Sequence, residues 1–364
     1  MTQHAAGQLI AQRFRLERVL HEAARATVWA ARDEQLGAAA AVKLARSPEA
    51  TARFARQAEA TAKVPSRHLV RVLDHGIDHG APYLAMELLE GEDLRRRFER
   101  EGRLSLEAAT ELGSRVAIAL AGVHEVRLVH GGVKPEHVFV ARAGGEEVMK
   151  LLGCGAVATD GARATEGDDA AVRREAAYLS PEQLRGQPVD LRTDAWSLGV
   201  VLFEAITGRA PFEAATIPDL VLKICADALP TASRFAPGIP QTLDGFFRRA
   251  LAREPAGRFQ SASELATAFT AASTGQAPPL PAVTFVPVVV RSPQESGGGG
   301  TARTVSYIAM MLVLVLVVLF IFFGLDKTRK RIMDLFDDIG WRAPPPGNAV
   351  AAVYLGEIRT GSSA

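Results

Sequence analysis

Apolar residues fall at short, strand-like intervals in the first part of this chain. Three strands joined by tight connections are predicted from Phe14 onward, the third covering residues 39–44. Two further strands are predicted around residues 70–72 and 83–88. The opening of the chain is therefore expected to form a sheet.

In other segments apolar residues recur every three or four positions, which predicts helices. Residues 50–63 read as a helix that ends before Pro65, and residues 94–99 and 106–126 read as two more. The pattern predicts an α+β protein, in which strands near the start of the chain are followed by helices.

A glycine- and proline-containing loop follows the longest of these helices. Residues 128–129 and 138–140 are apolar and are predicted to be short buried strands on either side of the loop. Pro135 and the pair Gly131-Gly132 interrupt regular structure between them.

Globular patterning ends near residue 272, which gives the following division of the chain. Residues 272–304 are rich in proline and glycine and are predicted to be a linker. Residues 305–325 contain a long run without charge, apolar on every face, and predict a single transmembrane helix. The remaining segments are an N-terminal extension (1–13), the globular domain (14–271) and a C-terminal tail (326–364).

Charge and composition exclude some classes of function. The formal net charge is +1, so no bulk attraction to nucleic acid is expected. The two cysteines, Cys154 and Cys225, suggest a reducing compartment and no disulfide. The histidines do not cluster with cysteine at metal-site spacing, so no metal site is predicted.

The loop at residues 130–137 resembles the H-R-D-L-K-P-E-N catalytic loop of bacterial-type, eukaryotic-like Ser/Thr protein kinases. Its lysine is retained as Lys134. Gly132 stands where the family has its catalytic aspartate, and His137 where it has a metal-binding asparagine. Gly153 stands where the aspartate of D-F-G would bind Mg²⁺. The resemblance covers about residues 10–270 and implies a bilobal kinase fold with a degenerate active site.

The same resemblance implies where a nucleotide would lie. Lys43 matches the lysine that pairs with ATP phosphates, while its usual glutamate partner is replaced by Gln57. Three side chains match the positions that sandwich adenine, and two residues match the hinge that contacts adenine through its backbone. These five positions are Val28, Ala41 and Phe139, followed by Glu87 and Leu89.

Residues that maintain the fold of this family are present. Asp194 is expected to bind the backbone of the catalytic-like loop, and Arg258 is expected to pair with Glu182. Thr159 and Thr165 are candidate phosphate acceptors in the activation segment.

These substitutions favour a catalytically impaired pseudokinase that acts as a signalling scaffold or allosteric regulator. Loss of the proton-accepting aspartate alone costs about 10²–10⁴-fold in rate. The alternative is an active Ser/Thr kinase with atypical metal ligation, which rests on Lys43 and Lys134. A third possibility is that the cleft binds ATP without Mg²⁺, as a structural ligand.

Partners and location follow from the same features. Protein partners such as another kinase are expected, together with the membrane. A kinase-like domain without a signal sequence is expected in the cytoplasm, which would place the tail outside, although the basic residues 327–331 favour the opposite orientation.

Overall fold

A computed structural model of the chain describes residues 4–23, 26–48, 50–64, 66–154 and 170–276. The chain divides into two compact units, residues 1–283 and 284–364, and every described residue belongs to the first.

The predicted transmembrane helix (305–325) and tail (326–364) lie outside the described residues, as do Thr159 and Thr165. Among the residues that are described, no helix is both long and apolar enough to cross a membrane.

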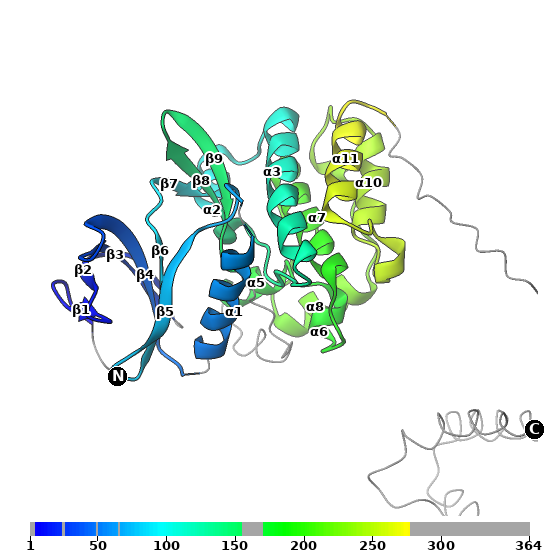
Figure 1. Cartoon of the computed structure of the whole chain (residues 1–364). Coiled ribbons are helices and arrows are strands. Elements are labelled where there is room, and N and C mark those ends of the chain that lie inside the picture. The colour runs from blue at the N-terminus through cyan, green and yellow to red at the C-terminus, as the bar shows by residue number, and fades with distance from the viewer. Residues whose placement is uncertain (1–3, 24–25, 49, 65, 155–169, 277–364) are drawn as a thin grey trace, which may run out of the picture. The chain divides into compact units, whose positions relative to one another are not determined.

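The first lobe is a six-stranded antiparallel sheet with one helix packed against it (Figure 1). The strand order is β1-β2-β3-β4-β6-β5. The predicted sheet and helix are confirmed, although β5 begins at Val72, two residues after its predicted start at residue 70. The elements are β1 (Leu9–Ile10), β2 (Phe14–Ala23), β3 (Ala26–Asp33), β4 (Ala38–Ala45), α1 (Ala50–Lys63), β5 (Val72–Asp78) and β6 (Ala81–Glu87).

Strand β4 shows how this sheet separates two layers of side chains. Ala40, Val42 and Leu44 pack into one apolar cluster with residues of β2 and β3. Ala41 and Ala45 belong to a second cluster that contains α1 residues. Because side chains alternate along a strand, Lys43 lies on the same face as Ala41 and Ala45, toward α1.

The second lobe is mostly helical and carries a small sheet of β7, β8 and β9. Its strands are β7 (Gly91–Asp93), β8 (Val138–Ala143) and β9 (Glu146–Leu151). Its helices are α2 (Leu94–Glu101), α3 (Leu106–Glu125), α5 (Ala170–Ala176), α6 (Pro181–Leu184), α7 (Leu191–Thr207), α8 (Ile217–Ala226), α9 (Ala232–Phe235), α10 (Thr242–Ala250) and α11 (Ala262–Ser273), with 3-10 turns η1 (Pro135–His137) and η2 (Pro255–Gly257).

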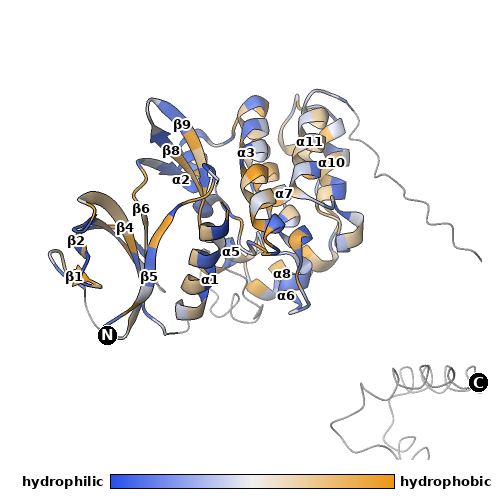
Figure 2. Ribbon diagram, in the orientation of Figure 1, coloured by the Kyte–Doolittle hydropathy of each residue, from blue (hydrophilic) through white to orange (hydrophobic). Residues whose placement is uncertain are grey.

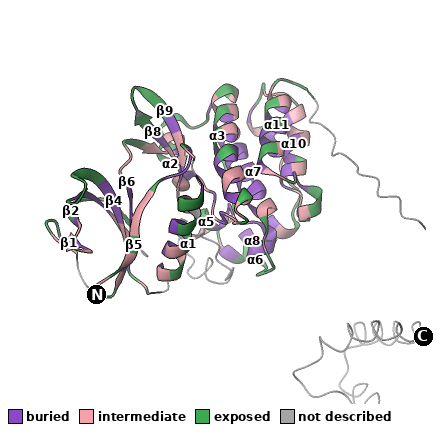
Figure 3. Cartoon of the chain, viewed as in Figure 1, coloured by how far each residue is buried: buried purple, intermediate pink, exposed green. Residues whose placement is uncertain are grey.

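Helix α7 forms the centre of the second lobe. Residues 193–206 are all buried, and α3, α10 and α11 pack around the helix. Figure 3 shows buried residues in purple on α7. Figure 2 shows α3 with both hydrophobic and hydrophilic residues, as expected for a helix with one side on this core. Asp190 caps the start of α7, and Gly208 ends it in the left-handed conformation.

The strand predicted at residues 128–129 is wrong. Arg127 has φ +59°, and the Leu128 N–H donates to the Val123 carbonyl that ends α3. Two residues further on, the backbone N–H groups of His130 and Gly131 donate to the carboxylate of Asp194. No partner strand takes up these groups, so the segment remains an extended loop.

The predicted pair of Arg258 and Glu182 is confirmed and is buried. Both guanidinium NH groups donate to the Glu182 carboxylate at 2.7 Å. Burial of Glu182 opposes its ionisation, but the hydrogen bonds and charge of Arg258 outweigh this and lower its pKa below the usual value. The pair ties α6, which contains Glu182, to Arg258 directly after η2.

Replacing Arg258 by alanine in the full-length protein is expected to lower the free energy of unfolding by about 3–5 kcal/mol, because Glu182 would remain buried without its partner. Urea unfolding measures this loss. The control is Arg209→Ala, which breaks an exposed pair with Glu213 and is expected to cost less than about 1 kcal/mol. Equal losses in the two variants would contradict the interpretation.

Candidate functional site

The loop at residues 130–137 is held by its backbone. The N–H groups of His130 and Gly131 donate to Asp194 at 2.8 and 2.7 Å, and Gln183 donates to the Gly131 carbonyl at 2.9 Å. Asp194 is completely buried. The predicted role of Asp194 is confirmed, and none of these contacts needs a particular side chain at positions 131 or 132.

His130 is fixed beside this loop as a neutral ring. Its Nδ1 accepts the Gly132 N–H at 3.2 Å, so its Nε2–H donates to the Leu152 carbonyl at 2.9 Å. Burial lowers the pKa of His130, although the charge of Asp194 opposes that shift.

His137 is likewise held as a neutral ring in the position predicted from the metal-binding asparagine. Its Nδ1–H donates to the Gly132 carbonyl at 2.6 Å. Burial lowers its pKa well below the usual value, and the positive charges of Lys134 and Lys43 add to the shift.

The His137 ring lies against Gly153, the position where the family has its metal-binding aspartate. A Cβ added at Gly153 would meet the ring at 3.0 Å from Cε1, 3.1 Å from Nδ1 and 3.2 Å from Nε2, closer than ordinary van der Waals contact. The imidazole therefore fills the space into which that aspartate would extend.

These residues do not fit Mg²⁺. The ion prefers oxygen ligands in octahedral geometry, and the two positions that would supply them are an imidazole and a glycine. Across the described part of the chain, no group of three or more His, Cys, Asp or Glu side chains is placed to hold a metal ion.

Lys43 lies on β4, on the face toward α1, without the usual acidic partner. Its Nζ lies 6.0 Å from the ring centroid of Phe54 on α1, and within the described residues it forms no hydrogen bond or ion pair. Burial lowers its pKa to about 8, and the charges of Arg53 and Lys134 act in the same direction. Gln57 is buried at the predicted position on α1, and its neutral side chain does not offset these charges.

Lys134 forms an ion pair with Glu175 at the end of α5. The Glu175 side chain is half exposed, whereas that of Lys134 is mostly buried. The charge of Glu175 also raises the pKa of Lys43, which opposes the larger lowering effects. The pair brings α5 to the same cleft as β4.

Some of the residues predicted to form the adenine slot lie together in the structure. Ala41 belongs to the apolar cluster beside α1, and Val28 and Leu89 pack against it. Phe139 is half-buried on β8 and is not a member of that cluster. The structure therefore brings together Val28 and Ala41, two of the three side chains predicted to sandwich adenine, with the hinge residue Leu89 beside them.

The hinge residue Glu87 ends strand β6, and Leu89 follows two residues later. The Glu87 carboxylate forms an ion pair with Lys150 at 2.7 Å and accepts the Arg71 N–H, which fixes the strand end. Within the described part of the chain, the Leu89 backbone N–H donates no hydrogen bond and can still meet a ligand acceptor.

Comparison with known proteins agrees with this geometry. The protein kinase domain family matches residues 14–269. The chain belongs to the protein kinase family.

Bacterial serine/threonine-protein kinases are among the relatives of this chain. It is 34% identical to the serine/threonine-protein kinase PknB of Mycolicibacterium smegmatis over 286 residues, which cover 76% of this chain and 45% of PknB. It is 30% identical to a probable serine/threonine-protein kinase of Clostridium acetobutylicum, over 71% of this chain and 40% of that protein. It is 29% identical to PrkC of Bacillus subtilis, again over 71% and 40%. The chain thus matches less than half the length of these relatives.

Sequence reasoning missed two groups of residues. Arg53 and Phe54 lie one turn before Gln57 on α1, and helical spacing would have placed them on the face toward Lys43. Arg95 on α2 pairs with Glu204 at 2.7 Å and with Glu136 at 3.3 Å, joining α2 to α7 and the catalytic-like loop. Nothing in the sequence indicated that these three charges would meet.

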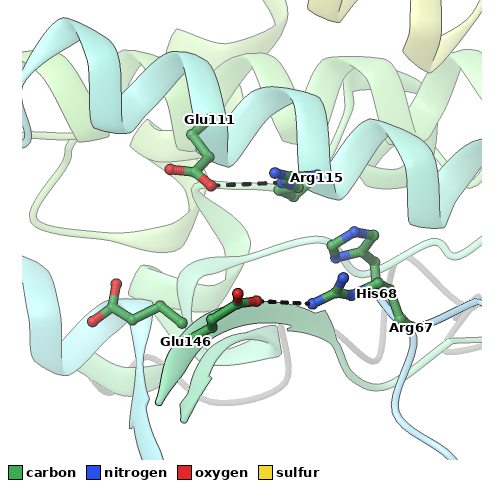
Figure 4. A pocket seen from close by; sticks show the side chains of 6 residues that line it. Arg67, His68, Glu111, Arg115 and Glu146 are labelled. Atoms are coloured by element: carbon green, nitrogen blue, oxygen red, sulfur yellow. Dashed lines mark ion pairs between the residues drawn. The ribbon is translucent and has the colours of Figure 1, made fainter. Parts of the chain in front are cut away.

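A hollow of about 380 Å³ contains none of the predicted site residues (Figure 4). Two ion pairs lie within its lining, Arg115 with Glu111 at 3.6 Å and Arg67 with Glu146 at 3.9 Å, and Glu147 pairs with Arg97 outside it. The lining residues are Arg67, His68, Glu111, Arg115, Glu146 and Glu147.

The contact between His137 and Gly153 predicts a measurable coupling. Gly153→Ala is expected to lower the free energy of unfolding by about 2–4 kcal/mol, because it adds both backbone strain at φ +81° and a steric clash. Gly80→Ala is the matched control, since Gly80 has the same φ and no atom within 4 Å of an added Cβ.

The control variant is expected to cost about 1–2 kcal/mol, from backbone strain alone. In the background of His137→Ala, the additional cost at Gly153 should disappear. A Gly153→Ala cost that is unchanged by His137→Ala in a double-mutant cycle would show that the ring does not fill this space.

The electrostatics of Lys43 predict a titration near neutral pH. After reductive ¹³C-methylation of the lysines, the Lys43 signal, identified by its loss in Lys43→Arg, should titrate with a pKa of about 8. Glu175→Gln should lower this midpoint and Lys134→Met should raise it, because the two charges act in opposite directions. The electrostatic account fails if neither variant moves the midpoint.

Proposed function

We propose that this chain is a pseudokinase, a member of the protein kinase family that retains the fold and has lost phosphoryl transfer. The observation that carries the proposal is the His137 ring packed against Gly153. The two positions that bind metal in the family are occupied here by a neutral imidazole and a glycine in contact with each other. Gly132 adds the loss of the proton-accepting side chain.

Physical chemistry supports this reading. Phosphoryl transfer depends on cations that neutralise the charge of the moving group, and on a base that accepts the hydroxyl proton. Absence of the base costs about 10²–10⁴-fold. Absence of the metal removes a further electrostatic contribution at the transferred phosphoryl group.

The second candidate is an active Ser/Thr kinase with atypical metal ligation. The observation that favours it is the pair of retained lysines, Lys43 and Lys134, which act on each other's charge in the cleft. A kinase of this kind would need oxygen ligands for its metal from another part of the chain or from the substrate.

The proposed pseudokinase acts through protein partners, another kinase or signalling proteins, as a scaffold or allosteric regulator. We also propose that residues 305–325 anchor it in the membrane once, with the kinase-like domain in the cytoplasm and the tail outside. The charge-free sequence of that segment supports the anchor. A reporter fused after Ala364 that is active only in the cytoplasm would overturn the orientation.

The test of the proposal is a phosphotransfer assay on the full-length protein with Mg²⁺ or Mn²⁺ and radiolabelled ATP. Wild type and Lys43→Ala are expected to give the same background of protein phosphorylation. An active Ser/Thr kinase assayed in parallel serves as the positive control. Metal-dependent incorporation that is lost in Lys43→Ala would favour the second candidate instead.

A further inference from the structure

The hollow in Figure 4 lies between three segments that are distant in the sequence. Glu111 and Arg115 extend into it from α3, opposite Arg67 and His68 of the loop after α1 and Glu146 at the start of β9. Its volume of about 380 Å³ is at the lower end of the range of small-molecule sites, roughly 300–1,000 Å³. The hollow is large enough for a compact ligand.

His68 is the buried polar side chain of this hollow. The residue is 6% exposed, and its Nδ1–H donates to the Met149 carbonyl at 2.9 Å. In the neutral ring Nε2 is therefore a hydrogen-bond acceptor. Within the described part of the chain Nε2 has no hydrogen-bond partner, and it is not sealed from solvent. The acceptor is available to a donor placed in the hollow.

The backbone around His68 fixes the position of this acceptor. The Leu151 N–H donates to the His68 carbonyl at 2.8 Å, and the Val70 N–H donates to the Leu151 carbonyl at 3.0 Å. These bonds join the loop after α1 to β9 on both sides of the imidazole. The acceptor is thus in place before a ligand arrives, which lowers the entropic cost of binding.

Four charged side chains surround the acceptor, and their pairing is weak. Arg115 lies 3.6 Å from Glu111, and Arg67 lies 3.9 Å from Glu146, distances longer than a hydrogen bond. Among the described residues these four side chains have no other ion pair or hydrogen bond. They are 45–79% exposed, so each can turn toward a ligand at little cost.

The two signs of charge decide which ligand fits. A cation alone would be repelled by the two arginines of the lining, and an anion alone would be repelled by its three glutamates. A ligand that carries both charges can pair with a carboxylate and a guanidinium at once. It would exchange two long ion pairs for shorter, hydrogen-bonded ones, which are stronger.

We propose that this hollow binds a compact zwitterion, a free α-amino acid. Its ammonium group donates to Nε2 of His68 and to the carboxylate of Glu111 or Glu146, and its carboxylate accepts hydrogen bonds from Arg115 or Arg67. The ligand would join the loop after α1 to α3. This site goes beyond the proposed function and does not depend on it, because none of its residues belongs to the catalytic-like loop.

The experiment is saturation-transfer difference NMR of the full-length protein with L-serine and L-glutamine at millimolar concentrations. The N-acetyl derivatives, which lack the ammonium group, and the carboxamide derivatives, which lack the carboxylate, are measured beside them. Each derivative is expected to bind about tenfold more weakly than its parent amino acid, because one set of lining charges loses its partner. The proposal is overturned if neither amino acid binds, or if both kinds of derivative bind as well as the parents.

Variants connect the binding to the named residues. Glu111→Gln and Arg115→Gln are each expected to weaken binding about three- to tenfold, and both change exposed side chains. The matched control is Glu213→Gln, which breaks the exposed pair with Arg209 at the same spacing of four residues and should leave binding unchanged.

His68→Phe removes the acceptor and keeps a ring, so a loss of about tenfold or more is expected. It also removes the hydrogen bond to Met149, so the two exposed variants decide the result if this variant is destabilised. Binding that is unchanged in both exposed variants would show that the amino acid lies elsewhere.

The phosphotransfer assay is independent of this result. Metal-dependent phosphotransfer overturns the proposed function and leaves the amino-acid site standing. Loss of the amino-acid site leaves the proposed function standing, since Gly132, His137 and Gly153 do not line the hollow.

Discussion

The buried carboxylate of Asp194 is the constraint on which the candidate site depends. It is completely buried and accepts hydrogen bonds from the backbone of His130 and Gly131 and from the His124 ring at 2.8 Å. A buried charge is tolerated only when its hydrogen bonds are made, so the loop backbone must follow a path that supplies them. Asp194 needs backbone N–H donors, and glycine supplies a backbone N–H like any other residue except proline. The loop can therefore keep its backbone path with glycine at positions 131 and 132.

Throughout the domain, the residues that maintain the fold are distinct from those that would carry out phosphoryl transfer. Contacts that organise the fold, the Arg258–Glu182 pair and the buried helix α7, are complete. The groups that would handle metal and proton in an active kinase are replaced by Gly132, His137 and Gly153. Selection for a folded domain and selection for phosphoryl transfer therefore act on different atoms of the same loop, and the first can continue without the second.

Sequence patterns predicted what depends on local periodicity and on motif position. Helix α1 has the predicted bounds, and the partners of Asp194 and Arg258 follow from aligned motifs. The strand at residues 128–129 was wrong because apolar character alone does not show whether a neighbouring strand exists to pair with. The contact of His137 with Gly153 could not be predicted from the sequence either, because it depends on how two segments 16 residues apart meet in space. The charge on Lys43 depends on Arg53, which no catalytic motif includes.

The His137–Gly153 contact also bears on what a single substitution could restore. A Cβ at position 153 would approach the ring to 3.0 Å, so an aspartate there would need the ring to move by a few tenths of an ångström or more. Position 137 would still carry an imidazole in place of the family's asparagine. Return of both metal-binding side chains would therefore require both positions to change.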